Sequence, residues 1–200
     1  MFTGIINHIG RFKGFRLGKK ELAVETISLA SKLEIGDSLA VNGVCLSVIK
    51  KEKNTLVFNL SEETLKKTNL SSLHSGEMLN IELPLTLDSL LSGHLVTGHI
   101  DSTEKVLKIS RKKDGKTLTI SLPSELSQYF IYKGSIALNG VSLTISEITA
   151  SSFCVDLIPI TIKNSNLGTL KKGDKVNIEC DIIGKYMYNF INKIKKNSQG

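Results

Sequence analysis

The sequence predicts an all-β fold in which two tandem domains each form a small closed barrel, followed by a helix at the C-terminus. One stretch occurs twice, at residues 38–48 and 135–145, and each copy has an Asn-Gly pair inside an apolar run. The copies lie 97 residues apart, and this register continues without a gap into the 170s, with about a third of the positions identical. Short alternating segments between turn residues indicate strands. Together these observations predict a duplicated β domain.

A second, shorter repeat precedes the first. Residues 2–6 (Phe-Thr-Gly-Ile-Ile) match residues 96–100 (Val-Thr-Gly-His-Ile) at an offset of 94. The second half therefore carries about three extra residues between its two repeats, which is the size of a loop insertion. Duplication for stability is one interpretation of the repeats. The other is that the chain carries two copies of one pocket.

The composition excludes several classes of protein. Of 200 residues, 40% are apolar and 22% charged, as in soluble globular proteins. No apolar run approaches the roughly 20 residues that span a bilayer, and no basic region precedes the apolar start, so we expect neither a membrane protein nor a signal peptide. The net charge of +7 is spread along the chain without aromatic alternation, which argues against nucleic-acid binding. Three cysteines without a CxxC spacing indicate reduced thiols in a cytoplasm.

Alternation of apolar and polar residues predicts strands in both halves. They include residues 22–29 and 56–60 in the first half, and 118–122 and 153–157 in the second. The turn residues that separate the strands are Gly14, 18–20, Gly36-Asp37, Lys53-Asn54, 112–115 and Gly173-Asp174. The repeated Asn-Gly pairs are either tight turns or bulges.

Short helices are expected at residues 61–68, where Ser61 can cap the first turn, and more weakly at the equivalent residues 160–165. Another is expected at 124–130. The connection at 85–93 is too apolar for a free linker, so we expect the two domains to touch.

Apolar residues at positions 183, 187, 190, 191 and 194 form a helical stripe at the C-terminus. Docking of this stripe on its own domain and self-association both remain open. Membrane-surface binding is disfavoured, because the polar face carries only a few lysines.

The chain has no phosphate-binding glycine motif and no metal-ligand spacing. His94 and His99 are five residues apart on an extended stretch, and we expect them to point to opposite faces.

Small hydroxyl and thiol side chains are the candidate functional groups. Residues 45–47 read Cys-Leu-Ser and residues 142–144 read Ser-Leu-Thr. If both leucines point into a barrel core, alternation directs the flanking side chains outward, toward a neighbour or a ligand. A solvated strand face would give the same pattern, but its recurrence in both halves, with Thr64 and Thr161 also in register, favours a binding site.

The two copies differ at chemically important positions. Pairing each Thr-Gly segment with the Asn-Gly segment of its own half predicts one apolar pocket with Phe2, Ile5 and the Cys45 thiol. The other pocket would contain the Ser142 hydroxyl and the His99 imidazole. Imidazole suits proton transfer near neutral pH, although a structural role is the more common fate of a single histidine.

Taken together, these residues resemble the riboflavin synthase family, α-chain type. The similar segments are Met-Phe-Thr-Gly-Ile-Ile at the start, Val-Asn-Gly-Val-Cys-Leu-Ser at 41–47, Gly-His-Leu-Val-Thr-Gly-His-Ile-Asp at 93–101, Leu-Asn-Gly-Val-Ser-Leu-Thr at 138–144, Leu-Ile-Pro-Ile-Thr at 157–161, and Glu-Cys-Asp-Ile-Ile-Gly-Lys-Tyr-Met-Tyr at 179–188. They cover almost the whole chain in order.

The resemblance implies two six-stranded Greek-key barrels, at residues 1–90 and 91–183, and a trimerisation helix and tail at 184–200. It implies that two molecules of 6,7-dimethyl-8-ribityllumazine dismutate into riboflavin and 5-amino-6-ribitylaminouracil, one giving and the other receiving a four-carbon unit. No metal or redox cofactor is implied. The active site would form between the N-terminal barrel of one subunit and the C-terminal barrel of the next in a homotrimer, and an association with lumazine synthase is compatible with this.

The resemblance also assigns site residues. The N-barrel pocket would comprise Gly4, Ile5, Ile6, Cys45, Leu46, Ser47, Asn59, Leu60, Ser61, Glu62, Glu63 and Thr64. The C-barrel pocket would comprise Gly98, His99, Ile100, Lys133, Ser142, Leu143, Thr144, Asp156, Leu157, Ile158, Pro159, Ile160 and Thr161. The residues linked to activity are Phe2, Ser38, Cys45, His99 and Ser142.

Two positions depart from the family pattern: Asn139, where Asp often precedes the Gly, and Ser47, where Thr is usual. If an Asp at 139 orients or polarises a catalytic group, Asn139 does so without charge. We hypothesise that His99 assists proton transfer from the 7-methyl group of the donor. Ser142, Cys45 or an activated water would then add to C7 of the acceptor. The alternative is a non-catalytic lumazine- or flavin-binding fluorescent protein, disfavoured because both halves keep their Thr-Gly and Asn-Gly segments.

Overall fold

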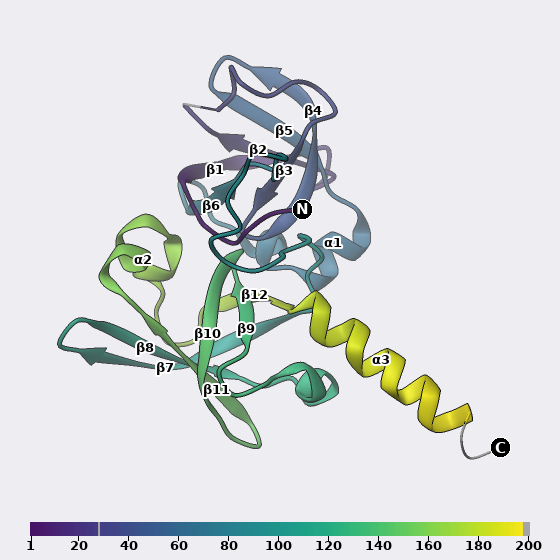
Figure 1. Cartoon of the computed structure of the whole chain (residues 1–200). Helices are drawn as coiled ribbons and strands as arrows, with labels where there is room; N and C mark the ends of the chain where they lie inside the picture. The colour runs from purple at the N-terminus through teal and green to yellow at the C-terminus, as the bar shows by residue number, and fades with distance from the viewer. Residues whose placement is uncertain (28, 198–200) are drawn as a thin grey trace.

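The computed structural model describes residues 1–27 and 29–197, and it contains two closed six-stranded antiparallel barrels followed by a helix (Figure 1). The first barrel consists of β1 (His8–Arg16), β2 (Glu21–Glu25), β3 (Ser38–Val41), β4 (Val44–Glu52), β5 (Thr55–Asn59) and β6 (Met78–Glu82). The second consists of β7 (Ser102–Lys112), β8 (Gly115–Ser121), β9 (Ser135–Leu138), β10 (Val141–Ile148), β11 (Ser152–Leu157) and β12 (Lys175–Cys180). The predicted fold class is confirmed.

The two barrels have the same strand order. The first runs β1-β2-β5-β4-β3-β6, and the second runs β7-β8-β11-β10-β9-β12, each closing on its first strand. In both barrels three hairpin-connected strands are followed by a fourth that returns beside the first of them, which is the Greek-key arrangement. Duplication of the sequence is therefore duplication of a whole barrel.

The Asn-Gly pairs are tight hairpin turns, between β3 and β4 and between β9 and β10. Asn42 and Asn139 have φ angles of 48° and 45°, and the glycines after them have φ angles of 78° and 80°. Two residues of positive φ match the twist of the flanking strands, and Asn-Gly is the pair that adopts them most readily. Bulges occur elsewhere. One lies inside β1 at Gly14, which the sequence had suggested as a turn between strands.

Strand alternation sorts the side chains as expected. Leu46 is buried in the core of the first barrel, while Cys45 and Ser47 on either side of it point outward. Leu143 packs against the core of the second barrel, between the outward-facing side chains of residues 142 and 144. The predicted direction of these side chains is confirmed.

The barrels touch at a junction built from the N-terminal segment and from six asparagines. Phe2 pairs with Val96 in an antiparallel bridge, with Phe2 N donating to Val96 O (2.7 Å) and Val96 N donating to Phe2 O (3.0 Å). The Phe2 ring is fully buried against Ala40 and Ala137, one from each barrel. Contact between the domains is confirmed, but it does not come from Leu87 and Leu90 of the linker, which are exposed.

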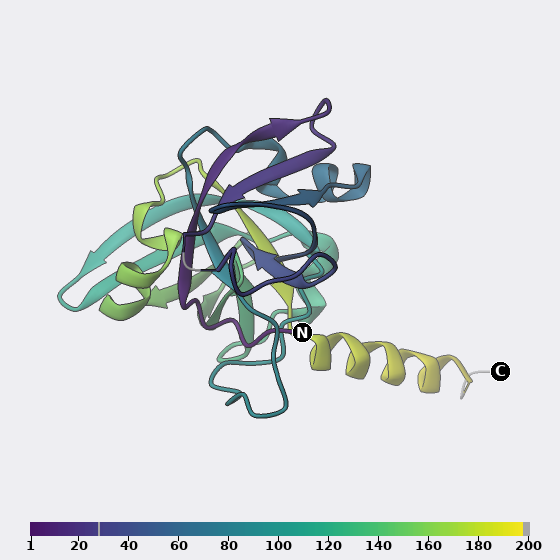
Figure 2. The same cartoon turned by 90° about the horizontal axis from the view of Figure 1, so that it is seen from above.

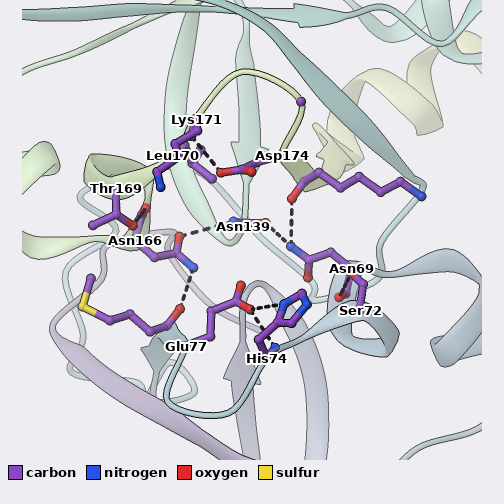
Figure 3. A pocket seen from close by; sticks show the side chains of 13 residues that line it. Asn69, Ser72, His74, Glu77, Asn139, Asn166, Thr169, Leu170, Lys171 and Asp174 are labelled. Atoms are coloured by element: carbon purple, nitrogen blue, oxygen red, sulfur yellow. Dashed lines mark hydrogen bonds and ion pairs between the residues drawn. The ribbon is translucent and has the colours of Figure 1, made fainter.

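The six asparagines form a hydrogen-bonded network with approximate twofold symmetry. Asn80 N donates to Asn42 Oδ1 (2.9 Å), and at the equivalent place Asn177 N donates to Asn139 Oδ1 (2.8 Å). Other bonds cross from one barrel to the other. Asn69 Nδ2 donates to Asn139 Oδ1 (3.1 Å), and its counterpart is Asn166 Nδ2 donating to Asn42 Oδ1 (2.9 Å). Figure 3 shows Asn69, Asn139 and Asn166 converging at a cleft of about 620 Å³.

The short helices form near the predicted positions. α1 (Glu62–Lys67) is capped by Ser61, whose Oγ accepts from Thr64 N, and α2 (Pro159–Asn164) is its equivalent in the second half. Three short 3₁₀ segments complete the set: η1 (Asn69–Ser72), η2 (Ser124–Tyr129) and η3 (Asn166–Thr169). α1 and α2 stand beside the strands that carry Cys45 and Ser142, and residues of each help to line the hollow next to that strand.

Helix α3 (Ile182–Asn197) projects from the second barrel (Figures 1 and 2). Two contacts hold its first half: Lys185 Nζ lies 2.6 Å from the Asp101 carboxylate, and the Tyr188 ring packs edge-on against Tyr129 of η2. The apolar stripe is largely exposed, with Met187 54% and Phe190 62% exposed. The interpretation that the stripe docks on its own domain is therefore wrong for most of the helix. Among the described residues, no helix combines the length and apolar character needed to cross a bilayer.

Candidate functional site

A hollow of about 270 Å³ lies beside Ser142 of β10, and a second of about 410 Å³ adjoins it. The first is lined by α2 and by the segment 4–6, which brings Ile5, Ile6, Ile158 and Ile160 around a largely apolar space. The adjoining hollow adds polar groups at one end. These are Lys133, Ser135, Thr144, Ser146 and Asp156.

Ser142 is held on both its backbone and its side chain. Its N–H donates to Gly4 O (2.8 Å), and its Oγ lies 2.7 Å from His94 Nδ1. Burial lowers the pKa of His94, an effect opposed by the Asp181 carboxylate. The imidazole is therefore neutral near pH 7, and its Nδ1 can accept the Ser142 hydroxyl proton.

Asp156 closes the polar end of the Ser142 hollow. Its Oδ1 accepts from Lys112 Nζ (2.7 Å) and from Thr117 Oγ1 (2.6 Å). The hydrogen bond from Lys112, followed by that from Thr117, lowers the pKa of Asp156, so this carboxylate is ionised at neutral pH. With Lys133 on the same wall, the hollow offers a fixed acceptor and a cationic donor.

An equivalent hollow of about 390 Å³ lies beside Cys45 of β4. Its walls are α1, the capping residue Ser61, and the segment 98–101. Cys45 N donates to Gly98 O (3.0 Å), which mirrors the bond between Ser142 and Gly4. This hollow is the more polar of the two, because His99 and the Glu63–Lys67 ion pair (2.8 Å) line it.

The predicted grouping of the Thr-Gly segments was wrong. Residues 4–6 line the Ser142 hollow of the second barrel, and residues 98–100 line the Cys45 hollow of the first. The bridge between Phe2 and Val96 pairs the two segments at the junction. Each segment therefore lies against the barrel of the other half. The segment 98–100 lies directly against β4 of the first barrel, since a Cβ on Gly98 would lie 2.5 Å from Cys45 Cβ.

The exchange also corrects the predicted chemistry of the pockets. The Cys45 thiol shares its hollow with the His99 imidazole, and the Ser142 hydroxyl lies in the apolar hollow with Ile5. The histidine that contacts Ser142 is His94, which sequence reasoning did not select. In the register of the Thr-Gly repeat His94 has no counterpart, so a search for repeated residues passes over it. His94 thus contacts Ser142 of the second barrel, whereas His99 lines the Cys45 hollow of the first.

The remaining candidate residues fall into three groups. The Ser142 hollow is lined by Lys133, Leu143, Thr144 and Asp156. The first barrel has Ser38, Ser47 and Asn59 at the positions that correspond, in this order, to Ser135, Thr144 and Asp156 of the second. Leu46, Leu60 and Leu157 have their side chains in the barrel cores. Glu62 and Pro159 begin α1 and α2. Phe2 is 0% exposed and packs at the junction against Ala40 and Ala137.

Asn139 belongs to the junction rather than to a hollow. Its Oδ1 accepts from Asn177 N (2.8 Å) and Asn69 Nδ2 (3.1 Å), and its Nδ2 donates to Asn166 Oδ1 (3.3 Å). An amide provides both the acceptor and the donor that this position uses. The side chain at 139 therefore orients groups that hold the barrels together.

Comparison with known proteins identifies the relatives of this chain. The family model of the lumazine binding domain matches twice, at residues 3–84 and 97–181. The riboflavin synthase of Bacillus subtilis (strain 168) is 38% identical over 98% of this chain and 93% of its own length. The riboflavin synthase of Actinobacillus pleuropneumoniae is 40% identical over 96% of this chain and 91% of its own.

Solved structures agree with the sequence comparison. LumP complexed with riboflavin superposes with a TM-score of 0.82 at 27% identity, covering 90% of this chain and 99% of that one. LumP complexed with 6,7-dimethyl-8-(1'-D-ribityl) lumazine gives a TM-score of 0.80 at 26% identity, with 90% and 98% coverage. With two matched lumazine-binding domains and relatives aligned over nearly their full length, this chain belongs to the riboflavin synthase family.

Proposed function

We propose that this chain catalyses the dismutation of two 6,7-dimethyl-8-ribityllumazine molecules into riboflavin and 5-amino-6-ribitylaminouracil. The observation that carries the proposal is the pair of equivalent hollows, each with a nucleophilic side chain next to a Thr-Gly segment. A reaction between two copies of one molecule needs two similar binding surfaces, and it needs donor and acceptor to be treated differently. The duplicated barrels supply the first condition, and the different residues beside Cys45 and Ser142 supply the second.

The Ser142 hollow suits a flat heterocycle with a polyhydroxylated chain. Isoleucine side chains of segment 4–6 and of α2 provide apolar faces for the ring, while Lys133, Thr144 and Asp156 offer hydrogen bonds to ribityl hydroxyls. In the Cys45 hollow, Ser61 and Thr64 provide comparable polar groups at the start of α1.

The reaction requires a proton to leave the 7-methyl group of the donor and a nucleophile to add to C7 of the acceptor. We assign the first step to His99, which lines the Cys45 hollow. For the second, the Ser142 Oγ lies 2.7 Å from His94 Nδ1, within the range for proton transfer to a general base. Cys45 and an activated water remain the alternative nucleophiles. Holding both rings together contributes a proximity effect of up to about 7–11 kcal/mol.

A complete site needs two subunits in this proposal, with the Cys45 hollow of one facing the Ser142 hollow of the next. The open stripe of α3 supports a homotrimer, because an exposed apolar helix face of this kind is usually covered by another subunit. Residues 1–90 and 91–183 then form the two lumazine-binding domains, and 184–200 the assembly segment. The three free cysteines fit a reducing cytoplasm.

The test is incubation of the purified chain with the lumazine as the only substrate. Riboflavin fluorescence should grow to one product molecule for every two lumazines consumed. A protein that binds lumazine and leaves the fluorescence unchanged would instead be a non-catalytic binder. Cys45→Ser and Ser142→Ala, assayed separately, identify the hollow that needs its nucleophile.

The lowered pKa of His94 gives a prediction for the pH dependence of kcat/KM. Only the neutral imidazole can accept the Ser142 proton, so the rate should be maintained at neutral pH and fall as pH drops through the lowered pKa of His94. The pH profile of kcat/KM should therefore bend below the ordinary pKa of histidine. In His94→Gln this bend should disappear and the plateau should be lower. A bend unchanged in His94→Gln would assign it to another group.

The assembly prediction concerns α3. A chain that ends before Tyr186 loses most of the exposed stripe and should be monomeric in sedimentation or light-scattering measurements. It should also lose turnover, because no second subunit completes the site. A chain lacking only residues 195–200 is the control and should remain trimeric. A trimer formed by the longer deletion would contradict this role of the helix.

A further inference from the structure

Two buried carboxylates lie behind the hollows, and neither appears among the candidate residues above. Glu82 ends β6 and is 6% exposed, and Glu179 on β12 is 2% exposed. Within the described part of the chain neither forms an ion pair with Lys, Arg or His. A buried carboxylate without a counter-ion is costly, so its hydrogen bonds indicate what it is for.

Within the described residues, the hydrogen bonds to the Glu82 carboxylate come from one Thr-Gly segment. Oε1 accepts from Thr3 N (2.7 Å) and Thr3 Oγ1 (2.7 Å), and Oε2 accepts from Gly4 N (3.0 Å). The arrangement continues along the segment, because Thr3 Oγ1 also accepts from Ile5 N (3.1 Å). Gly4 O in turn accepts from Ser142 N. Glu82 therefore fixes the wall of the Ser142 hollow through Thr3 and Gly4.

Glu179 repeats this arrangement on the other side. Oε1 accepts from Thr97 N and Thr97 Oγ1 (both 2.6 Å), and Oε2 accepts from Gly98 N (2.9 Å). His99 N donates to Thr97 Oγ1 (3.3 Å), and Gly98 O accepts from Cys45 N. The carboxylate of the second barrel thus fixes the wall of the Cys45 hollow.

In the described part of the chain, the groups that contact these carboxylate oxygens are N–H and O–H donors, and the charge of Lys185 also favours the ionised form of Glu179. A glutamine keeps one acceptor oxygen but replaces the other with an NH₂ group, which would point at an N–H or O–H. Burial raises the pKa of both Glu82 and Glu179, and the hydrogen bonds from the Thr-Gly segments act in the opposite direction. The protein therefore keeps two desolvated carboxylates whose hydrogen bonds hold these segments in place.

We infer that Glu82 and Glu179 are positioning residues that act across the junction. Each lies on the last strand of one barrel and sets the substrate-binding wall of the other barrel's hollow. The kinetic part of this inference rests on the proposed function, whereas the ligand-binding part does not.

The experiment compares Glu82→Gln and Glu179→Gln with Glu52→Gln. Glu52 is a matched control, because its carboxylate is hydrogen-bonded to Arg16 on the surface and touches neither Thr-Gly segment. The reporter for the Cys45 hollow is the rate of alkylation of Cys45 by iodoacetamide, mapped by peptide mass, and its protection by riboflavin. Once Cys45 is alkylated, riboflavin binding followed by fluorescence reports on the Ser142 hollow.

Glu179→Gln should weaken riboflavin protection of Cys45 at least tenfold and leave binding to the alkylated protein within threefold of wild type. Glu82→Gln should weaken riboflavin binding to the alkylated protein at least tenfold and leave riboflavin protection of Cys45 within threefold of wild type. Both should lower kcat/KM for the lumazine at least tenfold, while Glu52→Gln should change none of these values. Thr3→Val keeps the Glu82 carboxylate but removes the hydroxyl that donates to it and accepts from Ile5 N, and it should weaken binding in the Ser142 hollow in the same direction.

Equal effects of both glutamine variants on both hollows, in proportion to a loss of Tm, would overturn the inference and leave a purely structural role. So would an effect of Glu82→Gln confined to the Cys45 hollow. If the wild-type chain binds riboflavin as described but forms none from the lumazine, the proposed function fails, and the binding measurements still decide the role of the glutamates.

Discussion

Gly4→Ala is expected to lower turnover by about a hundredfold or more, because misplacement of a reacting group by 1 Å is enough for a loss of this size. Gly4 has a φ angle of 76°, and a Cβ added there would lie 2.6 Å from Ser142 Cβ and 2.7 Å from Ser142 N. These atoms belong to a strand and cannot move aside cheaply. The segment must therefore withdraw from Ser142, which breaks the bond between Ser142 N and Gly4 O.

Gly76→Ala is the matched control for this prediction. Gly76 has a φ angle of 82°, but a Cβ there would meet nothing within 4 Å. It should cost about 1–2 kcal/mol of stability from its left-handed backbone alone and leave turnover unchanged. Steady-state kinetics and urea unfolding of both variants distinguish the effect of left-handed backbone strain, which both share, from the effect of the steric clash with Ser142, which only Gly4→Ala has. A Gly4→Ala enzyme with kcat within threefold of wild type would show that this contact does not set the site.

Asn42→Ala is expected to lower the free energy of unfolding by about 3 kcal/mol or more. Asn42 Oδ1 accepts from Asn80 N and Asn166 Nδ2, both at 2.9 Å, and all three residues are buried. Each buried donor left without an acceptor costs about 1–3 kcal/mol, and the positive φ of residue 42 adds about 1–2 kcal/mol for alanine. Urea unfolding at constant protein concentration measures the total.

Asn42→Gly divides this effect into its two causes. Glycine accepts the positive φ but offers no side-chain acceptor, so it should recover about 1–2 kcal/mol and leave the rest of the loss. Because Asn166 lies in the second barrel, calorimetry should also show the two barrels unfolding less cooperatively in both variants. An Asn42→Ala protein within about 1 kcal/mol of wild type would contradict a structural role for the network.

The sequence predicted those parts of the fold that depend on local pattern. Period-two alternation placed Leu46 inside and Cys45 outside, since neighbouring residues on a strand face opposite ways. The Asn-Gly pairs indicated tight turns or bulges, and the structure shows hairpin turns, since few other pairs accept two positive φ angles. Ser61 indicated the start of α1, because a serine hydroxyl can cap the first turn of a helix.

The sequence could not predict which Thr-Gly segment serves which hollow. Both segments and both hollows are near copies, so local pattern fits either pairing equally well, and long-range contacts such as the bridge between Phe2 and Val96 decide between them. The asparagine network was hidden for another reason. Asn69 and Asn166 belong to polar stretches that look solvated, and their burial depends on how two barrels meet. His94 was missed because its partner Ser142 lies 48 residues away.

The crossing of the two Thr-Gly segments has a consequence for synthesis on the ribosome. The first barrel has all its strands once residue 82 has emerged, yet the wall of its hollow is made of residues 98–100. The carboxylate that holds this wall, Glu179, is translated later still, in the last strand. A nascent or prematurely terminated chain would thus contain every strand of the first barrel without the finished wall of its hollow, and only an almost complete polypeptide would acquire affinity for its ligand.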